Sequence, residues 1–131
     1  MRNDELPERL IKSKEVIETM IIHAETALEH DRYFKSLNVD RDVAAYRDAV
    51  LMQLGQVGEA CSYAKLPDET ADEYDHIDWR QINGFRNHAY HEYERLDFDL
   101  AWYIVDELLE PLIEDLLDVA KDLDRRVCEL L

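Results

Sequence analysis

The sequence predicts an all-α protein, an up-and-down bundle of four to five helices. Apolar residues recur at three- and four-residue steps through most of the chain, which is the period of an amphipathic helix. Only three glycines and three prolines interrupt the 131 residues, and the sequence contains no strand-like alternation or internal repeat. A chain of this length buries about two-thirds of its unfolded surface in one core. We therefore expect residues 1–131 to form a single domain.

The first predicted helix runs from about Pro7 to about Phe34. Proline is favoured in the first turn of a helix, because the N–H that it lacks would have no helical partner there. Asp40 is predicted to cap a second helix that reaches about Ala64, since a carboxylate can accept hydrogen bonds from first-turn N–H groups.

Gly55 and Gly58 lie inside this second helix, where glycine is less stable than alanine. We expect them to permit close approach by a neighbouring helix. The acidic stretch that follows, up to Asp75, is predicted to be a connector with room for one helical turn.

Asp78 is predicted to cap a third helix, and residues 96–99 to turn the chain into a fourth. Pro111 lies inside the fourth helical pattern. A proline in a helix interior removes one hydrogen bond and clashes with the preceding turn. We therefore expect Pro111 to kink this helix or to split it into two pieces.

The net charge of −16 is unevenly distributed. Residues 97–131 carry 11 acidic and 3 basic residues, whereas residues 76–96 carry 3 of each. A general nucleic-acid binder would show a basic face, and none is visible. We interpret most of the carboxylates as solvated helix faces. Any contact with RNA must then be local, or the acidic faces belong to a basic partner.

The cysteines and the apolar runs of the sequence indicate the cellular compartment. Cys61 and Cys128 are far apart and lack the spacing of metal ligands, which favours two buried or idle thiols over a disulfide. We find no apolar run typical of a signal peptide or of a membrane span of roughly 18 residues. A cytoplasmic protein without membrane association is expected.

Groups that can perform chemistry are concentrated in residues 79–93. Arg86, His91 and Tyr93 follow one another as arginine, four residues, histidine, one residue and tyrosine, with Asn87 directly after the arginine. This pattern resembles the RX4HXY signature of HEPN-domain proteins. The surrounding residues from about Arg41 to Leu116 look like the HepT branch of that superfamily. The resemblance is carried by Tyr46-Arg47-Asp48, Gly58-Glu59, Trp79-Arg80-Gln81-Ile82, Gly84-Phe85-Arg86-Asn87, Trp102 and Ile104-Val105.

The resemblance implies an all-α HEPN-like toxin that acts as a metal-independent endoribonuclease on RNA such as tRNA or mRNA, without a cofactor. It implies a homodimer or higher homo-oligomer whose cleft holds the site. The implied partner is an MNT-type nucleotidyltransferase antitoxin, which in some such pairs adds AMP to the motif tyrosine. Carried over to this chain, Arg86 and His91 are catalytic, Asn87 is supporting, and Tyr93 is both supporting and a possible modification site.

The chemistry of RNA cleavage agrees with these residue types. Attack by a 2′-hydroxyl needs a base, an acid and positive charge on the transition state. Histidine titrates near neutrality, and arginine binds phosphate in a fork. On one straight helix, however, Arg86 and His91 point about 140° apart. Either the helix loosens near Ala89, or a two-fold related copy supplies the complementary group; we favour the dimer.

Other interpretations remain open. Arg86 could pair with Glu59, alone or together with a catalytic role, and His91 could interact with carbonyls at a helix end. His88 and His91, together with Glu92, could be imagined as a metal site. Two histidines on a helix without a placed third ligand are weak evidence, so no metal site is predicted. The main alternative function is a catalytically inactive HEPN binding module that pairs with a nucleotidyltransferase. A nucleotide-binding half of a two-part transferase has less support, because no phosphate-binding glycine loop is present.

Overall fold

The computed structural model describes residues 5–62, 65–86 and 98–131, and these residues form helices with short connections. No strand occurs among them, which confirms the all-α class. The elements are α1 (Glu5–Ser36), α2 (Ala44–Cys61), α3 (Asp68–Glu73), α4 (Trp79–Arg86), α5 (Phe98–Tyr103), the π-helical turn η2 (Ile104–Leu108) and α6 (Leu109–Leu130).

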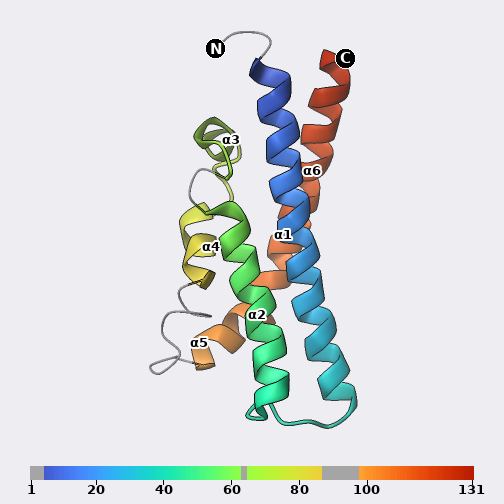
Figure 1. The fold of residues 1–131 in the computed structure, drawn as a ribbon, viewed down its shortest axis with the longest axis vertical. Helices are drawn as coiled ribbons and strands as arrows, with labels where there is room; N and C mark the ends of the chain where they lie inside the picture. The colour runs from blue at the N-terminus through green and yellow to red at the C-terminus, as the bar shows by residue number, and fades with distance from the viewer. Residues whose placement is uncertain (1–4, 63–64, 87–97) are drawn as a thin grey trace.

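The long helix α1 is the centre of the bundle. It packs along α2 on one side and along α6 on another, and it runs antiparallel to both (Figure 1). Helix α4 packs against α2, and the short α3 lies beside the N-terminal half of α1 (Figure 1). The N-terminal end of α1 and the C-terminal end of α6 therefore lie at the same end of the molecule.

The core is a continuous cluster of apolar side chains from α1, α2, α4 and α6. Fully burying one such side chain stabilises the fold by about 1.5–3 kcal/mol. The largest side chains that are almost completely buried are Tyr46, Phe85, Leu10, Ile17, Met20, Leu54, Leu109, Leu116 and Leu123.

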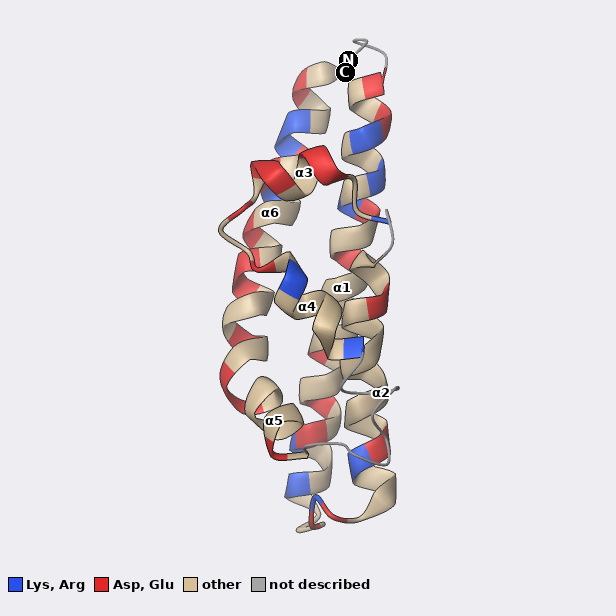
Figure 2. Cartoon of the chain, turned by 90° about the vertical axis from the view of Figure 1, so that its left-hand side faces the viewer, with Lys and Arg blue, Asp and Glu red and all other residues tan. Residues whose placement is uncertain are grey.

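Acidic side chains cover the outside of the bundle. Figure 2 shows them on α3 and along α6. The carboxylates of α6 are mostly exposed, including Glu110, Glu114, Asp115 and Asp118, whereas its Ile113, Leu116 and Val119 are buried. These carboxylates form solvated faces, as the sequence indicated.

The connection between α1 and α2 corrects one prediction. Asp40 does not cap the second helix, because its carboxylate accepts a hydrogen bond from the backbone N–H of Asp42 at 2.9 Å within the turn. This local Asx turn competes with capping. Helix α2 instead begins at Ala44, after Val43, without a side-chain cap. Asn38 allows the reversal because it adopts a left-handed conformation with φ of 58°.

The cap of α4 is confirmed. The backbone N–H of Gln81 donates to Asp78 Oδ1 at 3.0 Å, which satisfies one of the unpaired donors of the first turn. The indole N–H of Trp79, the first residue of α4, also donates to the carbonyls of Ala71 and Tyr74 at 3.2 and 3.1 Å. The connector thus fixes where α4 starts.

Pro111 has the effect that its position predicted. The fourth helical pattern is divided into α5 and α6 by η2, which ends three residues before Pro111. Because the proline ring cannot fit under the carbonyl of Glu107, a widened turn at this point relieves the clash. In Figure 1, α5 turns away from α6 at this point.

The two cysteines are free thiols, with Cys61 buried and Cys128 exposed. This confirms the expectation of two unpaired thiols. Among the described helices, none combines the length and the apolar character needed to cross a membrane.

Candidate functional site

Arg86 is the last residue of α4, and its position depends on a glycine of α2. A Cβ atom added to Gly58 would lie 2.7 Å from the carbonyl oxygen of Ile82 and 2.8 Å from the backbone nitrogen of Arg86. No other amino acid could occupy position 58 without moving one of the two helices. The prediction that Gly58 permits close approach of a neighbouring helix is confirmed.

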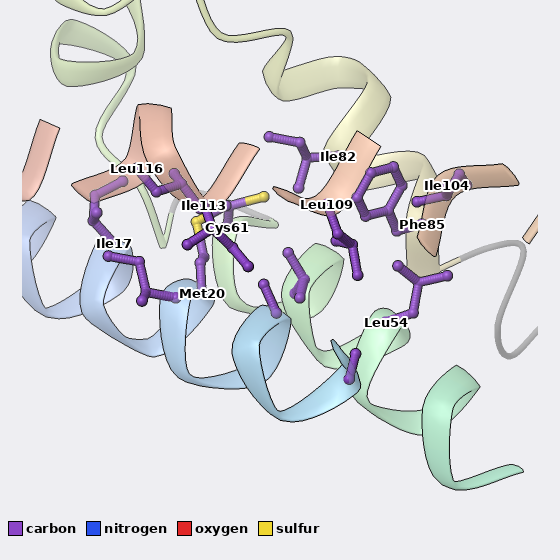
Figure 3. Close-up of a cluster of buried hydrophobic side chains, with 14 of the residues drawn as sticks. Ile17, Met20, Leu54, Cys61, Ile82, Phe85, Ile104, Leu109, Ile113 and Leu116 are labelled. Atoms are coloured by element: carbon purple, nitrogen blue, oxygen red, sulfur yellow. The ribbon is translucent and has the colours of Figure 1, made fainter. Parts of the chain in front are cut away.

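The apolar side of α4 holds the helix in this position. Ile82 and Phe85 are buried and point into the core, toward Leu54 of α2 and Leu109 of α6 (Figure 3). Because Phe85 immediately precedes Arg86, its burial turns the arginine side chain toward the edge of α2. The Cys61 thiol lies 3.4 Å from Asn83 Oδ1 and reinforces the contact, and burial raises the pKa of this thiol to about 11.

Glu59 holds the guanidinium of Arg86. The Arg86 Nε atom lies 3.0 Å from Glu59 Oε2, and both side chains are partly exposed, at 23% and 35%. The pairing that the sequence left open is therefore confirmed. Since a guanidinium carries five N–H donors, a contact through Nε and binding of a phosphate do not exclude each other.

Lys65 forms a second contact with the same carboxylate. Its Nζ atom lies 3.2 Å from Glu59 Oε1 and 3.1 Å from the Glu59 carbonyl oxygen. Glu59 is thus shared between two cations, one on each carboxylate oxygen. The charge of Glu59 is thus compensated by Arg86 and Lys65.

Asn87, His91 and Tyr93 lie outside the described residues. The structure therefore places Arg86 alone among the four predicted site residues. It does not test whether Arg86 and His91 of one chain, or of two chains, converge.

Phe98, the first described residue after the motif, also contacts α2. Arg47 places its guanidinium over the ring of Phe98, the first residue of α5, at 4.9 Å from the ring centre. Arg47 and Gly58 are 11 residues apart, about three helical turns, so they lie on the same side of α2. One side of α2 therefore contacts both Arg86, the first residue of the motif, and Phe98, the first described residue after it.

An ionic network that is buried at Asp31 and exposed at Asp106 holds α5 at the other end of the bundle. Arg41 donates to both carboxylate oxygens of Asp106 at 3.0 and 2.7 Å and to Asp31 Oδ1 at 3.0 Å. Its guanidinium also lies 4.0 Å from the ring centre of Trp102. The Tyr46 hydroxyl donates to Asp31 as well.

Asp31 stays ionised in this network. Burial opposes its charge, but hydrogen bonds from Lys35, Tyr46 and Arg41 outweigh that effect and lower the pKa of the carboxyl. The interaction with Asp106 raises the pKa of Arg41.

Comparison with known proteins identifies the family. The family described as "HepT-like: Ribonuclease HepT-like" matches residues 24–119, well over half of the chain. This span contains α2, α4, the motif and the Arg41 network. The chain belongs to the HepT-like ribonuclease family. The all-α bundle described above is thus a HEPN-like fold, as the residues around Arg86 indicated.

Relatives of this HepT-like chain occur in Methanocaldococcus jannaschii. A protein named "Gamma-glutamylcyclotransferase and putative RNase" is 30% identical over 60% of this chain and 35% of its own length. Two proteins named "Putative RNase" are 33% and 26% identical, over 47% and 63% of this chain and 54% and 69% of their own lengths. The chain thus spans about a third and about half of the first two relatives. No solved structure matches it significantly.

The sequence pointed to Glu59 as a possible partner of Arg86 and as part of the HepT-like resemblance, which also included Arg47 and Trp102. It did not predict the contacts of Arg47, Arg41 and Lys65. The aromatic residues Phe98 and Trp102 were the sequence signal that could have predicted the contacts of Arg47 and Arg41, since an arginine elsewhere in a chain often stacks on such rings.

Proposed function

We propose that this HepT-like chain is a toxin that cleaves RNA as a metal-independent endoribonuclease. The observation that carries the proposal is family membership combined with the position of Arg86, a motif arginine placed at a partly exposed edge by Gly58 and Glu59. An arginine in this setting can bind a phosphate, because the contact with Glu59 limits the freedom of its side chain before the phosphate arrives.

The proposed reaction uses the substrate's own 2′-hydroxyl. A base removes the 2′ proton, the 2′ oxygen attacks the adjacent phosphorus, and the bond to the 5′ oxygen of the next nucleotide breaks. The leaving oxygen takes a proton from an acid, and a 2′,3′-cyclic phosphate remains on the upstream fragment. Arg86 stabilises the negative charge of the transition state, and His91 acts as the acid or the base. Asn87 orients the phosphate, and Tyr93 anchors it.

The active assembly in this proposal is a homodimer. Arg86 and His91 lie five positions apart in the sequence, so a regular helix would direct them about 140° apart. A two-fold axis would bring the arginine of one copy to the histidine of the other. In this proposal an MNT-type nucleotidyltransferase antitoxin neutralises the toxin by transferring AMP from ATP to the Tyr93 hydroxyl, with release of pyrophosphate.

A catalytically inactive binding module is the second candidate. The acidic faces of α3 and α6 favour it, because they suit a basic partner protein better than RNA (Figure 2). In this case the motif would be structural, or only a target for modification by the nucleotidyltransferase.

The two candidates differ in a cleavage assay with purified protein and a mixture of tRNA and mRNA in EDTA. The toxin proposal predicts cyclic phosphate ends with the wild type, and a loss of at least about 100-fold in rate for Arg86→Ala and for His91→Ala. Expression of the wild type, but of neither variant, should stop cell growth. Wild-type protein that cuts no RNA but forms a stable complex with a nucleotidyltransferase encoded beside it would support the binding module.

A further inference from the structure

A groove between α1 and α2 ends at the residues that hold Arg86. It has a volume of about 530 Å³, and Glu59 and Lys65 form one end of its lining. Lys12, Thr19 and His23 of α1 line the rest, together with Glu15, Val16, Gln56 and Ala60. Because Glu59 contacts Arg86 at 3.0 Å, a strand bound at the arginine would find this groove directly beside it.

The charge of this groove distinguishes it from other hollows on the described surface. Its lining has two lysines and two glutamates, and Glu59 is also paired with Arg86. The groove between α1 and α6 is lined by Glu25, Glu29, Glu110 and Glu114 with Arg32 as its cation, and the one between α4 and α6 by Asp78 and Asp115. The α1–α2 groove thus has a balanced charge, and on a chain with a net charge of −16 it repels a polyanion less than these two grooves do.

The groove also offers the groups that a nucleotide needs. Val16 and Ala60 provide an apolar surface against which a base can lie. Thr19 and Gln56 offer polar groups that can hydrogen-bond to a base or ribose. The ring of His23 is held in place by a hydrogen bond between its Nδ1 atom and Gln53 Oε1 at 2.7 Å. Lys12 lies across the groove from Lys65, and both can contact phosphates.

We propose that the α1–α2 groove binds the nucleotide of single-stranded RNA next to the phosphate held by Arg86. Glu59 connects the two places, since it contacts Arg86 through one carboxylate oxygen and Lys65 through the other. The inference rests on the proposed ribonuclease function. It adds a subsite that extends the RNA contact along α1 and α2.

The test separates binding from cleavage. The probe is a fluorescein-labelled 12-nucleotide RNA with 2′-O-methyl groups throughout, which lacks the nucleophile for cleavage. Anisotropy gives its Kd for the full chain at several salt concentrations. Two groove variants are compared with matched controls. Lys12→Ala is matched by Lys121→Ala on α6, an exposed lysine outside the groove. Thr19→Trp, which fills the groove without a change of charge, is matched by Thr26→Trp, two turns further along α1.

Both threonines form the same local contact, a hydrogen bond to the carbonyl four residues earlier, at 2.9 and 2.7 Å. We expect Lys12→Ala and Thr19→Trp to raise Kd by about fivefold or more and the controls by less than about twofold. Lys12→Ala should also reduce the salt slope of log K by about 0.7, the value for one phosphate contact on a single strand. Melting curves by circular dichroism verify that each variant is folded.

Equal Kd values for the groove variants and their controls would overturn the inference, as would a wild type that does not bind the probe at low salt. If the probe depends on the groove although the wild type cuts no natural RNA, the subsite stands and the ribonuclease proposal fails. If the Thr19→Trp variant cuts natural RNA normally and also binds the probe normally, the subsite inference fails and the ribonuclease proposal stands.

Discussion

At the scale of single residues, Glu59 determines where Arg86 lies. The carboxylate contacts Arg86 at 3.0 Å and Lys65 at 3.2 Å, although both cations are partly exposed. Exposed ion pairs contribute little to stability, about 0.2–1 kcal/mol. We therefore infer that this ion pair contributes mainly by fixing the position of the Arg86 guanidinium, and contributes little to the stability of the fold. Glu59 acts through Arg86, so it is a positioning residue.

We therefore predict that Glu59→Gln lowers kcat for RNA cleavage by about tenfold, because the arginine is no longer held for the transition state. The free energy of unfolding should change by less than about 1 kcal/mol. Steady-state kinetics and urea unfolding measure the two quantities. Glu129→Gln is the control, since it removes an exposed ion pair on α6, in which Glu129 Oε1 lies 2.7 Å from Arg125 Nη1. A kcat that falls equally in both variants would mean that Glu59 has no special role.

At the scale of elements, the packing of α4 on α2 requires a glycine. Gly58→Ala would place a methyl group within 2.8 Å of two backbone atoms of α4, both in the segment that ends at Arg86. Overpacking of this kind costs about 1–3 kcal/mol. We expect a lower free energy of unfolding by that amount and a loss of RNA cleavage that exceeds the fraction unfolded, because Arg86 is displaced.

Gly84→Ala provides the matched control within α4. A Cβ atom at Gly84 would meet no atom of the described residues within 4 Å, and alanine is the better helix former by about 1 kcal/mol. This variant should be as stable as the wild type or more stable, and fully active. Thermal unfolding and the cleavage assay check both variants. Full activity of Gly58→Ala would show that the close approach is not needed to place Arg86.

The ionic network around Asp31 makes the end of the bundle sensitive to acid. The folded-state pKa of Asp31 lies below its unfolded value, so its stabilisation is present above the unfolded pKa of about 3.9 and is lost as the pH falls through the folded pKa. Asp31→Asn should cost about 2–3 kcal/mol at pH 7, because Arg41 and Lys35 lose a buried partner.

This cost should shrink when urea unfolding is repeated at decreasing pH below about 4, because the unfolded wild type then takes up a proton at Asp31 before the folded protein does. Asp124→Asn, which alters an exposed pair with Lys14, is the control and should cost less than about 1 kcal/mol. A difference between wild type and Asp31→Asn that is independent of pH would contradict the role of the charge.

The elements that sequence predicted correctly depend on local signals. Asp78 caps the helix that begins at the next residue, and Pro111 acts on the turn just before it. The predicted cap at Asp40 was wrong because its carboxylate accepts a hydrogen bond from the nearby backbone N–H of Asp42 instead. The contacts of Arg41 with Trp102 and of Arg47 with Phe98 join residues about 50 or more positions apart. Such contacts depend on tertiary packing, and helical periodicity contains no information about them.

At the scale of the whole molecule, acidity limits where RNA can bind. A net charge of −16 repels a polyanion at a distance, and the carboxylates of α3 and α6 add to this over much of the surface (Figure 2). Arg86 and Lys65 both contact Glu59, and Lys12 lines the α1–α2 groove, so these cations offer RNA a place for local contacts. Recognition of RNA would then depend on short-range contacts and on a specific target, and general binding to nucleic acid is not expected.

In the proposed mechanism two chains complete each active site, with Arg86 from one chain and His91 from the other. Co-refolding equal amounts of Arg86→Ala and His91→Ala chains tests this arrangement. In a random mixture half of the dimers contain both chains, and each of these has one intact site out of two. We therefore expect the mixture to recover about a quarter of the wild-type cleavage rate from two inactive parents. A mixture that remains as inactive as its parents, although mass spectrometry detects the mixed dimer, would contradict it.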